Sequence, residues 1–452
     1  MISKIKKLNR IFNPRTIALI GAIDRPGSVG LGLCKNLLEG EMAREIFFVN
    51  PYYKKVLGKN TYPFVTSITK PVDLAIIAVP SEIVPRVIKE CCEKGVGGII
   101  IISSGFAETG ESGKKLQEEV LGLTKEANIL LIGPNCLGVI RPFIKLNASF
   151  APATPKAGEI AFVSQSGALI DSVVDRSLLE NYGFSNLISY GNEADLQLSD
   201  FLEWLEKDEK TKVIGVYLEA IKDGKRFMQV ARKISKPIVI LKAGKTKSGA
   251  QAVSTHTAAL AGTWEVYSAV FKQLGMIEVE TTEELFDALK ALAWQPKCKG
   301  GVGIVTNGGG YGVLIADFCE KFGIELPELK PEILKRLESS KAMHPAFSRK
   351  NPLDIVGDAL PERYDVALDT LLSQKEIGGL IVVQTFQIMT DTISDAKVII
   401  KAKAKYPQKP ILCMFVGGKF TNPGIELLEK NKIPNYSDPK RTVLAMKMLV
   451  NY

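Results

Sequence analysis

Apolar runs and amphipathic segments alternate through the first 140 residues. Runs with almost no polar residue are TIALIGA (16–22), EIFFVN (45–50), VDLAIIAVP (72–80), GGIIIISSG (97–105) and ILLIGPN (129–135). The segments at 31–40, 81–95 and 111–128 have helical spacing instead. Strands that are apolar on both sides are typical of a parallel sheet covered by helices on both faces. The pattern therefore predicts an α/β fold that begins with a Rossmann-like domain.

Two stretches rich in small residues and proline, NASFAPATPKAG (147–158) and QPKCKGG (295–301), divide the chain. We predict three domains, at 1–146, 147–296 and 297–452. The second and third open alike, with IAFVSQSGALIDSVV (160–174) and VGIVTNGGGYGVLIADF (302–318), and each has an Asn-x-x-Asp, at 192–195 and 351–354. This similarity predicts two flavodoxin-like domains related by an ancient duplication, with convergent α/β patterning as the alternative.

The amino-acid composition indicates which kinds of ligand and which cellular compartment to expect. The chain has 452 residues, a net charge of +9 and 46% hydrophobic residues. The basic residues are spread along the chain, which argues against nucleic acid and favours anionic small molecules. Seven cysteines without a CxxC, together with only two histidines, indicate reduced cytoplasmic thiols and no metal site. No apolar run reaches about 18 residues, so we expect no membrane span.

The first glycine-rich loop, LIGAIDRPGSVG (19–30), follows a strand and opens a helix, where nucleotide-binding sheets hold phosphates. The second strand ends in NPYYKK, which places Lys54 and Lys55 where NAD sites carry an acidic residue. Lysines suit coenzyme A with its extra phosphate. NADP is the competing ligand, and an empty domain is the third alternative. KAGKTKSG (242–249) lacks a glycine that a nucleoside triphosphate loop requires, so no such site is predicted.

Two further turns join a strand to a helix through glycine, SQSGA (164–168) and TNGGGYG (306–312). Free backbone N–H groups at a helix N-terminus attract anions, so we expect the two turns to hold phosphate together. Close packing of the helix on the sheet is the alternative explanation of the glycines. The residues concerned are Ser164, Gln165, Ser166, Gly167, Ala168, Asn307, Gly308, Gly309 and Gly310.

His256 lies in VSTHTAALAG (253–262), which is interpreted as a loop of small and hydroxylated residues. Few other residues of the chain are candidate nucleophiles, although a surface or capping histidine remains the alternative. Glu219 ends the apolar strand VYLEA, at the sheet edge where ligands bind; a plain strand end at the surface is its alternative. A carboxylate that accepts one imidazole N–H orients the other nitrogen for attack. We predict His256 and Glu219 as the catalytic pair.

Several segments, taken in chain order, resemble the α subunit of ADP-forming acyl-CoA (acetyl-CoA) synthetases, in the superfamily of succinyl-CoA synthetase. They are LIGAIDRPGSVG, IISSGFAE (101–108), LIGPNCLGV (131–139), FVSQSGAL (162–169), LEA (218–220), STHTAALAG (254–262) and VTNGGGYG (305–312). The resemblance implies an acid–thiol ligase, acyl-CoA + ADP + phosphate ⇌ acid + CoA + ATP. An acyl phosphate and a phosphohistidine at His256, supported by Glu219, would be the intermediates.

The resemblance also implies a coenzyme A site and a partner. ADP or ATP with Mg²⁺ would bind a separate ATP-grasp β subunit, in an α₂β₂ heterotetramer. A non-catalytic CoA-binding regulatory protein and a nicotinamide-dependent enzyme are the alternatives, and the acid is not identified. The predicted CoA-binding residues are Gly21, Ala22, Arg25, Gly27, Ser28, Val29, Gly30, Asn50, Pro51, Lys54, Ser104, Gly105, Phe106 and Asn135.

Overall fold

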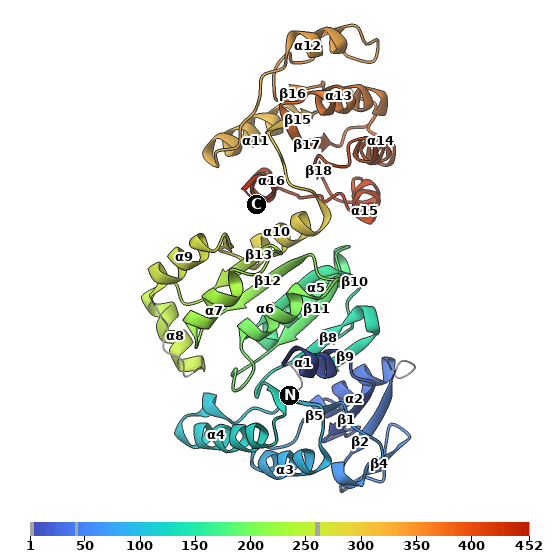
Figure 1. Cartoon of the computed structure of the whole chain (residues 1–452). Coiled ribbons are helices and arrows are strands. Elements are labelled where there is room, and N and C mark those ends of the chain that lie inside the picture. Colours follow the sequence, from blue (N-terminus) through green and yellow to red (C-terminus); the bar gives the residue numbers. More distant parts are fainter. Residues whose placement is uncertain (1–3, 41–43, 258–262, 452) are drawn as a thin grey trace. The chain divides into compact units, whose positions relative to one another are not determined.

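The computed structural model describes residues 4–40, 44–257 and 263–451, with the backbone alone for 254–257. The chain forms two compact units, Met1–Val279 and Glu280–Tyr452. The first unit contains two seven-stranded sheets and the second a four-stranded sheet. Each unit is described by itself below, with the elements labelled as in Figure 1.

The first sheet has the order β3-β4-β2-β1-β5-β6-β7, and its pairs are parallel except for β3 with β4. Its strands are β1 Thr16–Ile20, β2 Glu45–Val49, β3 Lys55–Val56, β4 Lys59–Tyr62, β5 Leu74–Ile77, β6 Gly98–Ile101 and β7 Leu130–Ile132. Its helices are α1 Lys4–Phe12, α2 Val29–Glu39, α3 Val84–Lys94 and α4 Glu111–Glu126, with 3₁₀ turns η2 Val65–Ser67, η3 Ser81–Ile83 and η4 Ala107–Thr109. The five predicted apolar strands are β1, β2, β5, β6 and β7.

Alternate residues of these strands enter two separate cores. Ile17 and Leu19 of β1 pack with residues of α1 and α2 on one face of the sheet. Ala18 and Ile20 pack with residues of α3 and α4 on the other face, and Figure 1 shows α3 and α4 side by side there. Burial on both faces explains why the strands are apolar throughout. The predicted Rossmann-like arrangement is confirmed.

The second sheet has the order β14-β13-β12-β10-β11-β8-β9, with β8 antiparallel to both of its neighbours. Its strands are β8 Gly138–Arg141, β9 Leu146–Ser149, β10 Ala157–Ser164, β11 Phe184–Ser189, β12 Val213–Leu218, β13 Ile238–Lys242 and β14 Ile277–Val279. The accompanying helices are α5 Gly167–Leu179, α6 Leu198–Glu206, α7 Gly224–Ala231, α8 Lys247–Thr257 and α9 Trp264–Gln273, with η5 Pro142–Ile144. The chain thus enters this sheet at Gly138.

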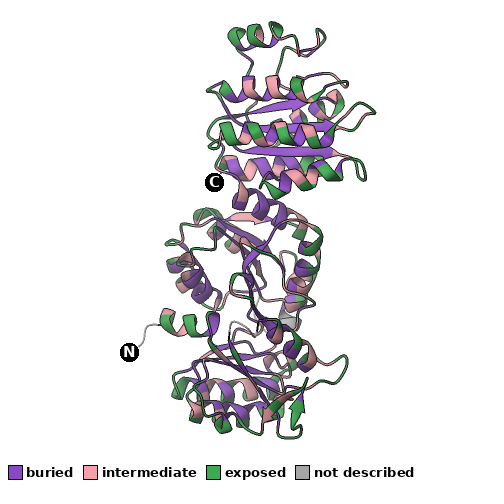
Figure 2. Cartoon of the chain, turned by 90° about the vertical axis from the view of Figure 1, so that its right-hand side faces the viewer, coloured by how far each residue is buried: buried purple, intermediate pink, exposed green. Residues whose placement is uncertain are grey.

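The second unit holds a parallel sheet of order β16-β15-β17-β18. The strands are β15 Gly301–Thr306, β16 Leu353–Asp354, β17 Ile377–Thr385 and β18 Ile411–Val416. The helices are α10 Thr282–Trp294, α11 Gly309–Lys321, α12 Pro331–Glu338, α13 Pro361–Ser373, α14 Thr392–Lys405, α15 Asn422–Lys430 and α16 Pro439–Asn451. Figure 2 shows its strands buried between helices whose outer faces are exposed.

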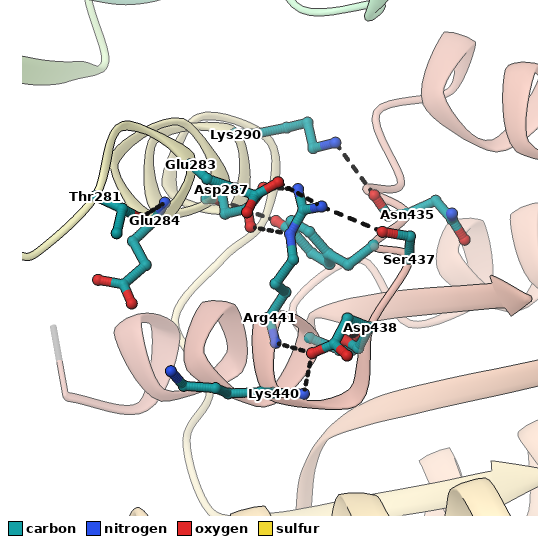
Figure 3. Close-up of polar contacts among 12 residues, drawn as sticks. Thr281, Glu283, Glu284, Asp287, Lys290, Asn435, Ser437, Asp438, Lys440 and Arg441 are labelled. Carbon is teal, nitrogen blue, oxygen red and sulfur yellow. Dashed lines mark hydrogen bonds and ion pairs between the residues drawn. The ribbon is translucent and has the colours of Figure 1, made fainter.

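Helix α10 is bound to the rest of this unit through buried ionic groups (Figure 3). The Arg441 guanidinium donates from Nε to Oδ2 of Asp287 at 2.7 Å and from Nη2 to Oδ1 at 2.8 Å. Lys290 donates from Nζ to Oε1 of Glu429 at 3.0 Å and to the carbonyl oxygen of Asn435 at 3.2 Å. Such a bidentate contact fixes orientation as well as distance. These contacts fix the orientation of α10 against α15, α16 and the segment between them.

The two flavodoxin-like sheets share a topology, since β13-β12-β10-β11 corresponds to β18-β17-β15-β16. The predicted similarity of the opening strand, turn and helix is confirmed. The match of the two Asn-x-x-Asp tetrapeptides is wrong, because Asn192 follows β11 whereas Asn351 precedes β16. Their spacing relative to the strands differs, so they occupy different places in the two domains. The domain limits at 146/147 and 296/297 stay a prediction.

Candidate functional site

The turn between β1 and α2 brings backbone close to backbone. Gly21 has φ +92°, and a Cβ there would lie 2.2 Å from the carbonyl oxygen of Ala78. A Cβ on Gly30 would lie 2.8 Å from the carbonyl oxygen of Gly21. The Ser28 hydroxyl caps α2 by accepting from the N–H of Leu31 at 3.2 Å. The glycines are thus required by this tight turn, which presents the start of α2 to a ligand.

A cavity of about 780 Å³ opens over this turn. Its wall contains eight of the predicted CoA-binding residues: Gly21, Arg25, Gly27, Ser28, Val29, Gly30, Asn50 and Pro51. Asn50 is held in place because its Nδ2 donates to the carbonyl oxygen of Ala22 at 2.8 Å. Ala22 itself is fully buried and Lys54 is exposed, and neither lines the cavity.

The same wall also carries aromatic and cationic residues, of which Phe64 and Arg86 were not predicted. Tyr52 and Tyr53 follow Pro51, and the guanidinium of Arg86 lies 5.6 Å from the centre of the Phe64 ring. Aromatic faces and a guanidinium suit a purine and its phosphates. The tyrosine pair was visible in PYYKK, whereas Phe64 and Arg86 come from segments with no motif of their own.

A second cavity of about 610 Å³ adjoins the first, since both are lined by Val29, Ala78, Val79 and Pro80. Besides Val29, it brings together six predicted residues from both sheets of the first unit: Ser104, Asn135, Gln165, Ser166, Gly167 and Ala168. Phe106 and Ser164 are fully buried and, like Gly105, do not line it. Most of the predicted CoA residues and most of the first predicted phosphate turn thus line two adjoining cavities.

A hydrogen-bond network joins the two sheets beside this second cavity. Asn135 donates from Nδ2 to Oδ1 of Asn192 at 3.3 Å, and Asn192 donates in turn to Glu108. The other oxygen of Glu108 accepts from the N–H groups of Gly105 at 2.6 Å and Phe106 at 3.2 Å. Burial acts to raise the pKa of Glu108, but these hydrogen bonds outweigh it and lower that pKa. Glu108 is therefore a carboxylate that holds the 105–106 backbone in place.

Asp171 also lines the second cavity and was not predicted. It lies on α5, one turn beyond the predicted phosphate turn, and burial raises the pKa of its carboxyl. Glu193, the residue after Asn192, is a second unpredicted carboxyl. It is 4% exposed, and burial raises its pKa to about 7. The sequence does not mark either carboxyl as unusual, because its raised pKa results from burial in the folded chain.

Glu219 is buried at 4% exposure, directly after β12. Burial and the nearby Glu219 carboxylate, to which the phenol hydrogen-bonds, raise the pKa of Tyr217 to about 12. Lys242 donates from Nζ to the carbonyl oxygen of Glu219 at 2.7 Å and lies 4.6 Å from the centre of the Tyr267 ring. Burial lowers the pKa of Lys242 to about 8. The alternative of Glu219 as a surface strand end is wrong, since the residue is enclosed by aromatic and cationic groups.

The side chain of His256 lies outside the described residues. Its backbone belongs to α8, so the prediction of a loop is wrong for residues 253–257. Ala250, Gln251 and Ala252 favour helix, and neither proline nor glycine interrupts residues 250–257. Helix α8 contacts η4, the turn that carries Glu108. Residues 258–262 lie outside the described residues.

The second predicted phosphate turn lies in the other unit, between β15 and α11. Asn307 is 2% exposed, and Gly308 and Gly309 begin the helix. A Cβ on Gly309 would come within 2.5 Å of Oδ2 of Asp354, so a carboxylate already lies against this helix end. The phosphate site shared by the two turns stays a prediction.

Within residues 4–40, 44–257 and 263–451, no group of three or more His, Cys, Asp and Glu side chains is placed to hold a metal ion. Over the same residues no helix has the length and apolar character needed to cross a bilayer.

Three family models match successive parts of the chain. They are a CoA binding domain at 15–142, a succinyl-CoA ligase like flavodoxin domain at 157–292 and a ligase-CoA domain at 302–448. They follow the three sheets in order. The predicted CoA-binding and succinyl-CoA synthetase-like fold is thereby confirmed.

Relatives match over almost the whole chain. The α subunit of ADP-forming acetate–CoA ligase II from Pyrococcus furiosus is 41% identical over 98% of this chain and 97% of its own. ADP-forming acetate–CoA ligase I from Archaeoglobus fulgidus is also 41% identical over 98% of this chain, which spans 64% of that protein's length. Among solved structures, the dinucleotide forming acetyl-coenzyme A synthetase 1 of Ca. Korarchaeum cryptofilum, in complex with phosphate and ADP, matches with a TM-score of 0.92. It is 35% identical, over 98% of this chain and 96% of that chain.

The predicted resemblance is confirmed by these matches: the chain belongs to the family of ADP-forming acetate–CoA ligases, acyl-CoA synthetases built from succinyl-CoA ligase-like domains.

Proposed function

We propose that the chain is the α-type part of an ADP-forming acyl-CoA synthetase that catalyses acyl-CoA + ADP + phosphate ⇌ acid + CoA + ATP. The observation that carries this proposal is the pair of adjoining cavities, one over the glycine turn at Gly21–Gly30 and the other against the turn at Gln165–Ala168. An acyl-CoA whose nucleotide lies in the first cavity would extend its thioester towards the second, where phosphate would be held by the N-terminus of α5.

In the first step a phosphate oxygen attacks the thioester carbonyl. The carbon–sulfur bond breaks, the acyl phosphate forms, and the proton of the phosphate ends on the CoA thiol. Backbone N–H groups of Gly167 and Ala168, at the start of α5, would stabilise the charge on the phosphoryl oxygens, as preorganised donors do. Arg25 and Arg86 on the wall of the first cavity would bind the CoA phosphates.

In the second step His256 would take the phosphoryl group from the acyl phosphate, which releases the acid as a carboxylate. Glu219 would accept the other imidazole N–H and stabilise the positive charge that develops on the ring. ADP would then receive the phosphoryl group on an ATP-grasp β subunit, with Mg²⁺ bound there, in an α₂β₂ assembly. Relatives named as α subunits support a β partner. Seven free cysteines, six of them buried, support the reducing cytoplasm as the compartment.

The test is phosphate labelling of the chain purified together with its partner subunit. With acetyl-CoA and radiolabelled phosphate, the wild-type chain should acquire an acid-labile, base-stable label, and His256→Ala should acquire none. Equal labelling of both would refute phosphoryl transfer through His256. A chain that binds CoA but neither labels nor makes ATP would instead be the regulatory alternative.

A further inference from the structure

The carboxamide of Gln165 makes three hydrogen bonds to the backbone at the end of β12. Its Oε1 accepts from the N–H groups of Glu219 at 2.5 Å and Ala220 at 3.1 Å. Its Nε2 donates to the carbonyl oxygen of Ala220 at 3.2 Å. A carboxamide offers the same donor and acceptor as a peptide group, so Gln165 extends the sheet's hydrogen bonding past Leu218. The turn before α5 and the Glu219 segment are thereby fastened to each other.

The second unit contains the same construction. Asn307 accepts at Oδ1 from the N–H of Thr385 at 2.7 Å and donates from Nδ2 to the carbonyl oxygen of Thr385 at 3.0 Å. Within each turn a hydroxyl bonds to both the N–H and the carbonyl oxygen of the residue two positions on, Ser164 to Ser166 and Thr306 to Gly308. Both turns therefore share one hydrogen-bonding pattern, in which a hydroxyl closes the turn and a carboxamide bonds to the neighbouring strand.

Strand register shows what each turn holds. Ser164 pairs with Tyr217 across β10 and β12, and Thr306 pairs with Val383 across β15 and β17. Two residues further on, Glu219 in the first unit corresponds to Thr385 in the second. The same fastening thus holds a carboxylate in one domain and a hydroxyl in the other.

We propose that Gln165 is a positioning residue, which fixes the Glu219 carboxylate relative to the phosphate turn. This rests on the proposed role of Glu219. Both lone pairs of Oε1 are used by Glu219 and Ala220, so the side chain serves the strand end, and phosphate is left to the backbone N–H groups of the turn. The sequence assigned Gln165 to phosphate binding, and the structure gives its carboxamide this different task.

Two further side chains hydrogen-bond to the backbone of residues 219–221. Lys242 bonds to the carbonyl oxygen of Glu219, and the Tyr267 hydroxyl accepts from the N–H of Ile221 at 3.0 Å. Residues 219–221 are therefore held from three elements, of which Gln165 supplies the link to the phosphate turn. A carboxylate that orients an imidazole must keep its place within a fraction of an ångström, since a misplacement of about 1 Å costs about 100-fold in rate.

The test compares Gln165→Leu, Gln165→Glu and a matched control, Gln229→Leu, on the exposed side of α7. Each is purified with the partner subunit. The leucine removes all three hydrogen bonds at similar size, whereas the glutamate keeps an acceptor for the two N–H groups and loses the donor to Ala220. Three quantities are measured: the rate of His256 phosphorylation by radiolabelled acetyl phosphate, KM for CoA with kcat, and amide exchange at residues 219–221.

For Gln165→Leu we expect phosphorylation and kcat to fall about 30- to 100-fold, with KM for CoA within about twofold and faster exchange at Glu219 and Ala220. Gln165→Glu should retain more of the rate, and Gln229→Leu should match wild type. A Gln165→Leu rate within about threefold of wild type would overturn the positioning role. So would a fall in kcat accompanied by an equal rise in KM for CoA. If Gln165→Leu fails to fold, Gln165→Met replaces it under the same criteria, because methionine also removes all three hydrogen bonds at similar size. Absence of label in wild type would refute the proposed function instead, which is a distinct result.

Discussion

Asp395 offers a direct test of how burial controls charge in the second unit. The residue lies on α14 and is fully buried. One carboxyl oxygen, Oδ2, accepts from Nε2 of Gln384 at 2.6 Å. The other, Oδ1, and the Oε1 of Gln384 are both buried without a hydrogen-bond partner among the described residues. A protonated Asp395 can donate from Oδ1 to Oε1 of Gln384, which satisfies both atoms at once, whereas an ionised one cannot.

The loss of stability at high pH can be worked out from the pKa of Asp395 in the folded and unfolded chain. Burial raises the pKa of Asp395 to about 7, helped by the negative charges of Asp391 and Glu362 and opposed by the Gln384 hydrogen bond. The unfolded value is about 3.9. Between these values the folded chain holds one proton more than the unfolded chain, so stability falls as pH rises. Over about three pH units at about 1.36 kcal/mol each, the loss is about 4 kcal/mol.

Asp395→Asn removes this titration and keeps the shape, with an Nδ2 that can donate to Oε1 of Gln384. We expect the variant to be more stable than wild type by about 1.5 kcal/mol at pH 5 and by about 4 kcal/mol at pH 8, because the unfolded carboxyl is already mostly ionised at pH 5. The measurement is urea unfolding at several pH values, with amide exchange of β17 peptides compared at each pH to isolate the second unit. A stability difference that is the same at pH 5 and pH 8 would refute the reasoning.

Asp391→Asn is the matched control for this experiment. Asp391 caps α14, and hydrogen bonds from the hydroxyl and N–H of Ser394 lower its pKa. A lowered pKa contributes stability above the unfolded value and loses it only as pH falls below that value. Its own titration therefore gives no trend between pH 5 and pH 8, and its replacement should show only the smaller change that comes from removing its charge near Asp395.

Three other changes test separate parts of the fold. Gly21→Ala, whose Cβ would lie 2.2 Å from the carbonyl oxygen of Ala78, should weaken CoA binding by calorimetry about tenfold or more. Gly27→Ala, with φ +74° and nothing within 4 Å, should cost only about 1–2 kcal/mol of backbone strain; equal CoA affinities for the two variants would contradict this account of the turn. Arg441→Met removes two charged hydrogen bonds to the buried Asp287 carboxylate and should destabilise the second unit by about 2–4 kcal/mol, with Arg441→Lys intermediate, both read from amide exchange in α16. Among the cysteines, Cys92 should react first with a thiol reagent in the native chain, because the other six are buried; modification of Cys136 before Cys92 would show that the second cavity admits the reagent.

The fold was predictable because its signal is local. Five apolar runs became five parallel strands, and Gly21 and Gly30 are required by close approaches of backbone that few other residues permit. The short pair β3-β4 was not predicted, since Lys55–Val56 and Lys59–Tyr62 are too short and polar to stand out. The His256 segment was misjudged because small residues were read as loop residues, although alanine is also the best helix former.

The candidate site was less predictable, because its chemistry depends on pairs of residues far apart in the sequence. Glu108 ends the segment IISSGFAE, but the sequence does not show that its carboxylate bonds Gly105, Phe106 and Asn192. Arg86 and Phe64 meet only through the packing of α3 against η2. Gln165 was identified as part of a phosphate turn, but which atoms its side chain binds depends on where β12 ends. A single sequence predicts where a glycine turn lies, but it does not show which distant residue each side chain of that turn will contact.

The two glycine turns differ in what lies next to them, and this difference assigns them different tasks. Both are closed by a hydroxyl and fastened to the next strand by a carboxamide. The first carries Glu219 on that strand, 4% exposed and close to Lys242. The second carries Thr385 there, while the Asp354 carboxylate lies directly against Gly309 at the start of α11. A carboxylate at a helix N-terminus competes with phosphate for the same N–H groups and repels it by charge. The first turn, whose carboxylate lies on the neighbouring strand and not at the helix end, is therefore the better anion site, and the second would need its Asp354 charge offset before it could share a phosphate.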